Sequence, residues 1–201
     1  DLAMARRDVE RALSFAPPHL SLYQLTIEPN TPFMHLPPPG LPAHDVVADM
    51  HQNLLPVVAG HGVERYEVSA FASAGHRCQH NLNYWLFGDY LAVGAGAHGK
   101  LTDNTTGQVT RSEKTRSPRL YMAQAESGRI GRGERVVAAP DLVFEYMLNA
   151  LRLREGFDFD DFERATGLPA AVLETPLERA AERGLIATDD AGSLAPTALG
   201  N

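Results

Sequence analysis

The sequence predicts an α/β protein whose helix–strand steps are followed by a small helical, winged-helix-like domain. Two observations carry this prediction: helical and strand periodicities alternate twice within residues 1–69, and three helical stretches precede a single hairpin near the end of the chain. With 201 residues and 44% hydrophobic content, the chain can bury a core large enough for one domain and a small appendage.

The first step begins with an amphipathic helix over residues 2–13, where apolar residues recur at helical spacing. Two prolines at residues 17–18 stop this helix, and residues 19–27 alternate like a strand. A helix that feeds a strand is typical of a parallel sheet or barrel. A proline-rich, irregular loop follows over residues 29–42. One helix is already running at residue 1 and another opens at residues 197–201, so we expect a piece of a longer protein.

The second step is a helix over residues 45–60 followed by a short strand at residues 66–69. Residues 71–102 then mix aromatic residues, histidines and glycines without a clean period, which is typical of a segment whose composition serves a site. Residues 102–133 are polar and punctuated by glycine, with a short helix at residues 119–126. We expect the second half of this polar segment to be a connector.

The last part of the chain predicts a helix that starts at Pro140, two more helices over residues 159–165 and 170–183, and a hairpin over residues 184–194. Three helices and a hairpin suggest a winged-helix-like module. Winged helices often bind DNA, but residues 141–201 carry 12 acidic and 5 basic side chains. This charge balance argues against a nucleic-acid partner.

Several classes of protein are excluded by what the sequence lacks. No run approaches the roughly 18 apolar residues of a membrane span, and the N-terminus has neither a basic start nor an apolar signal core. The single cysteine excludes an intrachain disulfide framework, so we expect a cytosolic protein. No Ser-His-Asp arrangement, P-loop or His-Glu-x-x-His motif supports hydrolase or phosphotransfer chemistry.

The most distinctive segment spans residues 76–85. His76, Cys78 and His80 are spaced by two, so on a strand all three side chains would project from one face. Imidazole and thiolate are ligands for zinc and for iron, haem iron included. A structural zinc site needs four ligands, and this segment offers three without a Cys-x-x-Cys pair. The spacing therefore disfavours zinc.

Haem fits the segment better, because haem iron needs only one or two axial ligands. His80 is the candidate ligand, and Tyr84, Trp85 and Phe87 offer flat apolar surfaces for a porphyrin face. In a structural alternative, His80 and Asn81 hydrogen-bond buried backbone groups while the aromatic residues fill a core. Spacing alone does not decide between the two.

Residues 94–99 read Gly-Ala-Gly-Ala-His-Gly and match the pattern G-x-G-x-x-G. A dinucleotide site requires a helix after the last glycine, which the polar residues 100–107 do not favour, so we reject it. Gly94 and Gly96 instead indicate a backbone that passes close to a packed element or a ligand. The basic cluster at residues 111–119 predicts either solvated surface or cations that pair with porphyrin propionates.

Four blocks follow one another in the chain, at residues 20–33, 66–69, 78–90 and 94–99. Together they resemble the HemW-type haem chaperones, a branch of the radical S-adenosylmethionine coproporphyrinogen-oxidase family. The resemblance runs over nearly the whole chain, and its most specific part is the His-Asn-x-x-Tyr-Trp block at residues 80–85.

This resemblance implies that residues 1–133 are the C-terminal part of a partial (βα) radical S-adenosylmethionine barrel with its extension. It implies that residues 134–201 are the HemN C-terminal-like helical, winged-helix-like domain. The function it implies is that of a chaperone, which binds haem and delivers it to recipient haem proteins. Any association with a membrane would be peripheral and would occur through such partners.

The resemblance also implies roles for individual residues. His80 would ligate the haem iron, and the rest of its block would contact the porphyrin. Thr26, at the end of the strand that matches the last barrel strand, would contact S-adenosylmethionine. A [4Fe–4S] cluster that binds S-adenosylmethionine needs three clustered cysteines, and this chain has one. We therefore expect the cluster and S-adenosylmethionine in a full-length parent and no radical chemistry in this chain.

Two other functions stay open. Oxygen-independent coproporphyrinogen III oxidase, a radical decarboxylase, shares the implied fold but is not expected to favour the His-Asn-x-x-Tyr-Trp block. The acidic residues 141–201 would alternatively serve as a docking module for a protein partner.

Overall fold

The computed structural model describes residues 1–128, 133–188 and 192–200. The chain forms two compact units, residues 1–78 and residues 79–201. The predicted domain boundary after residue 133 falls inside the second unit, and as a statement about domains it stays a prediction.

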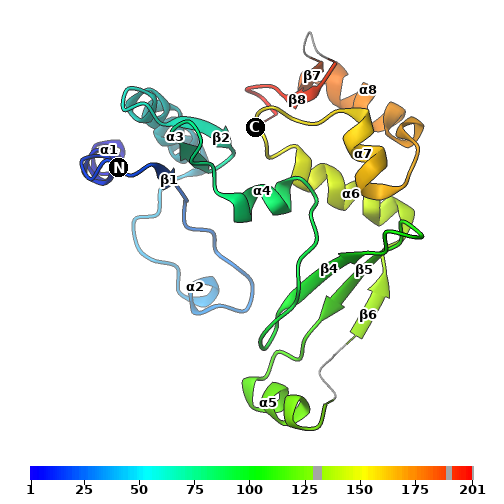
Figure 1. Ribbon diagram of the computed structural model, residues 1–201. Helices are drawn as coiled ribbons and strands as arrows, with labels where there is room; N and C mark the ends of the chain where they lie inside the picture. The colour runs from blue at the N-terminus through cyan, green and yellow to red at the C-terminus, as the bar shows by residue number, and fades with distance from the viewer. Residues whose placement is uncertain (129–132, 189–191, 201) are drawn as a thin grey trace. The chain divides into compact units, whose positions relative to one another are not determined.

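The first unit consists of two long helices and a three-stranded sheet (Figure 1). Its elements are, in chain order, α1 (Leu2–Leu13), β1 (His19–Ser21), α2 (Pro32–His35), α3 (His44–Ala59), β2 (Glu64–Glu67) and β3 (Ala70–Ala72). The carboxylate of Asp1 caps α1 by accepting a hydrogen bond from the Met4 backbone N–H at 2.9 Å. The core is made by apolar side chains of α1, α3 and the sheet, namely Val9, Leu13, Leu54, Val58, Val63 and Phe71.

Both predicted helix–strand steps are present, but their strands do not pair with each other. β1 and β2 each pair antiparallel with β3, so β1 and β2 run in the same direction with an unpredicted strand between them. The strand predicted over residues 19–27 is too long. It ends at Ser21 because its partner β3 has only three residues and turns back toward β2 there. The proline-rich loop contains the one-turn helix α2.

The second unit combines a three-stranded meander, a helical module and a hairpin. β4, β5 and β6 lie side by side as an antiparallel sheet, and β7 pairs with β8 (Figure 1). The elements are, in chain order, α4 (Gln79–Trp85), β4 (His98–Thr102), β5 (Val109–Glu113), α5 (Pro118–Glu126), β6 (Gly133–Val136), α6 (Ala139–Ala150), α7 (Phe159–Thr166), the 3₁₀ helix η1 (Ala170–Leu173), α8 (Glu174–Glu182), β7 (Ile186–Thr188) and β8 (Leu194–Pro196).

The predicted helices at the end of the chain and the hairpin after them are confirmed, although the hairpin tip, residues 189–191, lies outside the described residues. The prediction missed β5 inside the polar segment. Its inward face carries Val109 and the charged Arg111, so the strand shows no hydrophobic alternation.

Tyr146 of α6 lies at the centre of the core of this unit. Its ring meets those of Phe87, Phe157 and Phe162 edge to face, at centroid distances of 5.5, 5.2 and 5.1 Å. Burial, together with the nearby Asp161 carboxylate, raises the pKa of the Tyr146 hydroxyl. Because Phe87 lies two residues after the end of α4, this aromatic cluster ties the segment after α4 to the helical module.

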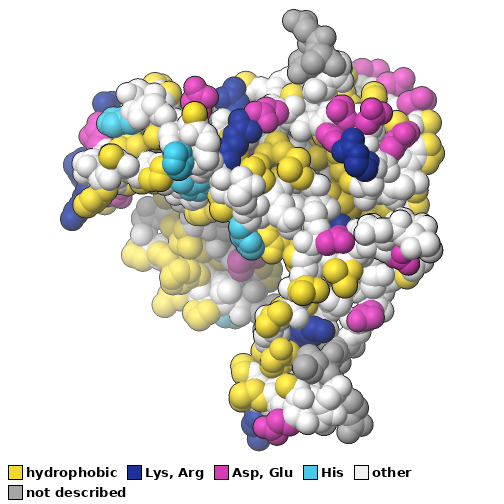
Figure 2. Space-filling view, in the orientation of Figure 1, with side chains coloured by type: hydrophobic (Ala, Val, Ile, Leu, Met, Phe, Trp, Pro, Cys, Tyr) yellow, Lys and Arg dark blue, Asp and Glu magenta, His cyan; other side chains and the backbone are white. Residues whose placement is uncertain are grey.

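The surface of the helical module is acidic. Figure 2 shows carboxylate side chains gathered over α7 and α8, as the charge pattern of the sequence predicts. Among the residues that the structure describes, no helix has the length and apolar character needed to cross a membrane.

Candidate functional site

The His-Asn-x-x-Tyr-Trp block folds as helix α4, so the one-face arrangement that a strand would give His76, Cys78 and His80 does not apply. Residues 79–85 pair with no strand, and the helix satisfies its backbone groups locally, as in the 2.8 Å bond from Leu86 N–H to the Leu82 carbonyl. In the described parts of the chain, no group of three or more His, Cys, Asp or Glu side chains could hold a metal ion.

The outer face of α4 presents His80 above an aromatic pair. His80 and Tyr84 are one helical turn apart, and their rings meet edge to face with centroids 4.9 Å apart. Tyr84 in turn packs against Tyr90 at 4.6 Å. His80 is exposed whereas both tyrosines are half-buried, so the imidazole does not serve a buried core. The helix offers solvent an imidazole with aromatic surface beside it.

The other two residues of the block lie on the same short helix. Asn81 and Trp85 are both half-buried. The Arg152 guanidinium lies 4.2 Å from the centroid of the Trp85 ring and covers one face of it. The buried Trp85 Nε1 has no hydrogen-bond partner among the described residues. Contact of Asn81 and Trp85 with haem stays a prediction.

A tight turn follows α4 and reverses the chain. Phe87 has a left-handed backbone with φ of 60°, and Gly88 donates its N–H to the Asn83 carbonyl at 2.6 Å. A Cβ on Gly88 would collide with the Asn83 side-chain amide, so the turn requires glycine. The turn directs Asp89 and Tyr90 back toward β4.

Lys100 of β4 holds this turn from inside. Its side chain is 2% exposed, and its ammonium donates to the Phe87 carbonyl at 2.9 Å, to Asp89 Oδ1 at 2.8 Å and to Thr102 Oγ1 at 3.2 Å. The ammonium also lies 4.2 Å from the centroid of the Phe87 ring. Three oxygen acceptors and an aromatic face therefore compensate the buried cation.

The pKa values of the pair reflect this arrangement. Burial lowers the pKa of Lys100, against the opposing effect of the Asp89 carboxylate. Burial by itself would raise the pKa of Asp89, but hydrogen bonds from Lys100 and from the backbone and hydroxyl of Thr102 outweigh it and hold that pKa below its usual range. Asp89 therefore stays ionised when it is bound in this network.

A second ion pair connects the meander to α6. The Arg111 guanidinium donates to Glu145 at 2.8 Å and to the hydroxyl of Tyr90, and Arg135 approaches the same carboxylate at 3.4 Å. Arg116, by contrast, is 73% exposed and pairs with Glu113 at 3.3 Å. Of the basic cluster at residues 111–119, Arg111 is therefore paired inside the unit whereas Arg116 lies at the surface. The two do not form a single cationic patch that could bind porphyrin propionates.

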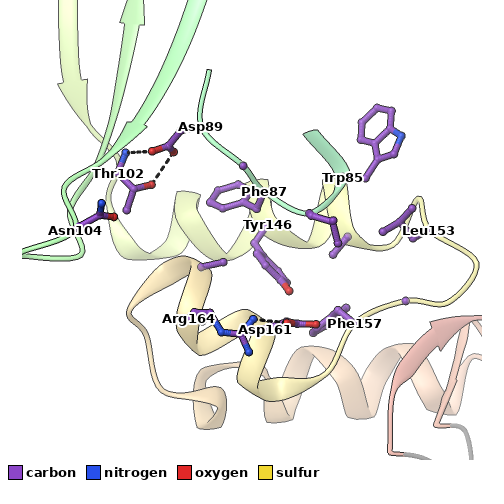
Figure 3. A pocket seen from close by; sticks show the side chains of 15 residues that line it. Trp85, Phe87, Asp89, Thr102, Asn104, Tyr146, Leu153, Phe157, Asp161 and Arg164 are labelled. Atoms are coloured by element: carbon purple, nitrogen blue, oxygen red, sulfur yellow. Dashed lines mark hydrogen bonds and ion pairs between the residues drawn. The ribbon is translucent and has the colours of Figure 1, made fainter. Parts of the chain in front are cut away.

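One cavity in this unit has a volume of about 380 Å³. In Figure 3, Phe87 and Tyr146 lie between two polar pairs, Asp89 with Thr102 and Asp161 with Arg164. None of its lining residues is a histidine, cysteine or methionine, so it supplies none of the usual haem-iron ligands of these types.

A smaller cavity, of about 210 Å³, borders the aromatic face of α4. Residues of α4, the turn, the meander and α6 line it: Tyr84, Phe87, Gly88, Tyr90, Lys100, Arg111, Glu145, Leu148 and Asn149. It thus joins the His80–Tyr84 face to α6.

The remaining predicted site residues lie elsewhere. Thr26 is exposed, in an irregular segment beyond β1. Gly94 and Gly96 have φ of 103° and 72°, which accounts for glycine at both positions, and a Cβ on Gly94 would meet no described atom within 4 Å. The strand β4 begins at His98, within this Gly-x-Gly-x-x-Gly motif, where a dinucleotide site would require a helix. Contact of these residues with ligands stays a prediction.

Sequence reasoning missed Asp89, Lys100 and Glu145 as parts of the site. The bonds they make join segments 11 and 34 residues apart, Asp89 with Lys100 and Arg111 with Glu145. No local pattern indicates that a lysine between glycine and leucine is buried. The side of β4 on which Lys100 lies can be assigned to the interior only once the pairing of β4 with β5 is known.

Comparisons with known proteins cover most of the chain. Residues 137–200 match the HemN C-terminal domain family. The haem chaperone HemW of Haemophilus influenzae is 42% identical and that of Escherichia coli 43% identical, each over 92% of this chain and 47% of the relative. The solved structure of the Escherichia coli coproporphyrinogen III oxidase HemN, a radical SAM enzyme, matches with a TM-score of 0.68 and 16% identity over 96% of this chain and 47% of that one. The chain thus spans about half the length of these relatives, and the structural match confirms the predicted HemN-like α/β fold.

Proposed function

The chain belongs to the HemW-type family of HemN-like proteins, and we propose from this premise that it carries the haem-binding surface of a haem chaperone. The observation that carries the proposal is the exposed His80 on α4 with the Tyr84 ring packed against it at 4.9 Å. Haem is the cargo, and the chaperone passes it on to recipient haem proteins in the cytoplasm or, through a partner, at a membrane.

The chemistry of the residues on α4 fits haem. One imidazole suffices as an axial ligand, and an exposed one is accessible to a large planar cargo. Aromatic surface next to the ligand suits the apolar porphyrin. His80 would hold the iron, and Tyr84 with its neighbours would contact the ring.

The residues present do not fit an iron–sulfur cluster. Cys78 is the single cysteine of the chain, whereas a cluster that binds S-adenosylmethionine needs three. We place the cluster and S-adenosylmethionine in the rest of a full-length parent, where Thr26 would approach the latter. Radical decarboxylation of coproporphyrinogen is the alternative function, and it draws only on the fold, because the match to HemN is 16% identical. Turnover of coproporphyrinogen by the full-length parent at enzyme-like rates would favour this alternative.

Haemin titration tests the proposal directly. We expect the chain to shift the Soret band of haemin on binding, and His80→Ala to lose this shift. His44→Ala is the matched control, because His44 is another exposed histidine on a helix, in the other unit. Equal Soret spectra from the unaltered chain and His80→Ala would remove His80 from the role.

A further inference from the structure

We propose that the porphyrin ring of the haem lies on a surface shared by α4 and α6, made of His80, Tyr84, Leu148 and Phe144, which we name the α4–α6 seat. This inference rests on the proposed haem-chaperone function and deepens it, because it states where the ring lies and which side chains set its affinity.

An outward apolar pair on α6 is the first observation. Phe144 and Leu148 are one helical turn apart, and their exposed fractions are 66% and 61%. The buried stripe of α6, with Leu142 and Tyr146, already packs into the core. Two large apolar side chains stacked on an outer helix face are more than an isolated surface residue and are typical of a surface that binds something.

The second observation is that Leu148 of this pair lines the same cavity as Tyr84, whose ring packs against the proposed haem ligand His80. The 210 Å³ cavity has Tyr84 of α4 and Leu148 of α6 in its walls. The same Tyr84 ring packs against His80 at 4.9 Å. Within this compact unit, Tyr84 therefore contacts His80 on one side and shares the cavity with Leu148 on the other.

The charges around the cavity are compatible with an apolar occupant. Both cations that line it already have carboxylate partners, Lys100 with Asp89 at 2.8 Å and Arg111 with Glu145 at 2.8 Å. A ring that covers the cavity would therefore leave no charge of these two pairs unpaired in a dry environment.

A porphyrin is the occupant that these observations favour. A partner helix would need apolar surface but no exposed imidazole at its edge. A metal ion without a ring would need further ligands, and the described residues offer no cluster of three. The larger cavity has aromatic walls but no histidine, cysteine or methionine among its lining residues. The α4–α6 seat, unlike the larger cavity, combines an imidazole with adjoining apolar surface.

The test uses two probes, haemin and metal-free protoporphyrin IX, titrated into the whole chain. Metal-free protoporphyrin makes no bond to an imidazole, so its affinity measures the apolar seat alone. We expect Leu148→Ser and Phe144→Ser each to weaken the binding of both probes by about five- to tenfold, since each removes apolar area that the ring would bury. The Soret position of bound haemin should stay unchanged, because His80 is intact.

Two further variants separate this inference from the proposed function. His80→Ala should abolish the haemin Soret shift and leave protoporphyrin affinity within about twofold. Val172→Ser, at another exposed apolar residue of the same unit, should bind both probes like the unaltered chain.

The seat would be overturned if Leu148→Ser and Phe144→Ser bound both protoporphyrin and haemin as tightly as the unaltered chain. This holds even if His80→Ala lost the Soret shift, a result that would still uphold the proposed function. Capture of a peptide instead of a porphyrin by the Phe144–Leu148 face would overturn it too. Identical haemin spectra from the chain and His80→Ala would instead defeat the proposed function itself.

Discussion

Replacement of Lys100 by methionine tests whether the buried ammonium stabilises the turn after α4. Methionine has a similar length and fills the same space, but it donates no hydrogen bond. The substitution removes the donor to the Phe87 carbonyl at 2.9 Å and to Asp89 at 2.8 Å. It leaves the backbone of the turn itself unaltered.

The size of the effect follows from what each acceptor keeps. Asp89 retains two bonds of 2.8 Å from Thr102, and its side chain is 37% exposed, so water can solvate it again. The Phe87 carbonyl loses its ammonium donor, which costs about 1–3 kcal/mol for a buried acceptor. The lost ion pair adds about 1 kcal/mol after allowance for exposure. Since removal of the cation also relieves its own desolvation, we expect a net loss of about 2 kcal/mol.

Urea denaturation followed by tryptophan fluorescence measures this loss of stability in the unit that contains Lys100. The chain has one tryptophan, Trp85 on α4, so the signal reports unfolding of residues 79–201. With a slope of about 2 kcal/mol/M, a loss of about 2 kcal/mol lowers the midpoint by about 1 M urea. Asp89→Asn in the Lys100→Met background should cost less than in the unaltered chain, by about 1 kcal/mol.

The other lysine of the chain, Lys114, supplies the control. It is half-buried on the meander side of the unit, and we expect Lys114→Met to change the free energy of unfolding by less than about 0.5 kcal/mol. Equal midpoints for Lys100→Met and Lys114→Met would refute the reasoning, because the ammonium would then contribute no net stability to the turn.

Three further predictions concern the same unit. The pKa of Asp89 is lower in the folded than in the unfolded chain, so its contribution to the free energy of unfolding is present above the usual carboxyl pKa and is lost as the pH falls below it. Denaturation measured from about pH 6 to about pH 3 should therefore show that Asp89→Asn loses less stability on acidification than the unaltered chain does. Gly156→Ala should destabilise the chain by about 3 kcal/mol or more, because the added Cβ would collide with the backbone of β8. Gly184→Ala should cost about 1–2 kcal/mol, because Gly184 has a similar φ but open space around it. Thermal melts that rank the two variants equally would contradict this. Phe162→Ala should cost about 3–5 kcal/mol, because the ring is fully buried against Tyr146, and Phe144→Ala less than about 0.5 kcal/mol, as measured by denaturation without ligand.

The helices of this protein were predictable because their signals are local. Caps, prolines and apolar residues at helical spacing lie within a few residues of one another, so α1, α3, α6 and the helices after α6 could be placed from sequence. The hairpin at the end of the chain carried its own turn residues. The family block at residues 80–85 likewise named the candidate ligand without any structure.

The strands were less predictable because pairing joins distant segments. β3 inserts between β1 and β2, which no periodicity of residues 70–72 indicates. The polar face of β5 hides its alternation, since its inward charge is neutralised by Glu145 on α6. A pattern rule that expects apolar inward residues must fail where a buried ion pair takes their place.

For the candidate site, sequence by itself determined which residue types are present: an imidazole, aromatic neighbours, and a single cysteine that excludes the cluster. Only the tertiary structure decided their arrangement. It made residues 79–85 a helix, so that His80 meets Tyr84 and parts from Cys78, and it brought Lys100 under the turn and Leu148 beside Tyr84. The physical reason is that residue chemistry belongs to each position, whereas burial, ion pairing and shared surfaces arise only when segments far apart in the chain pack together.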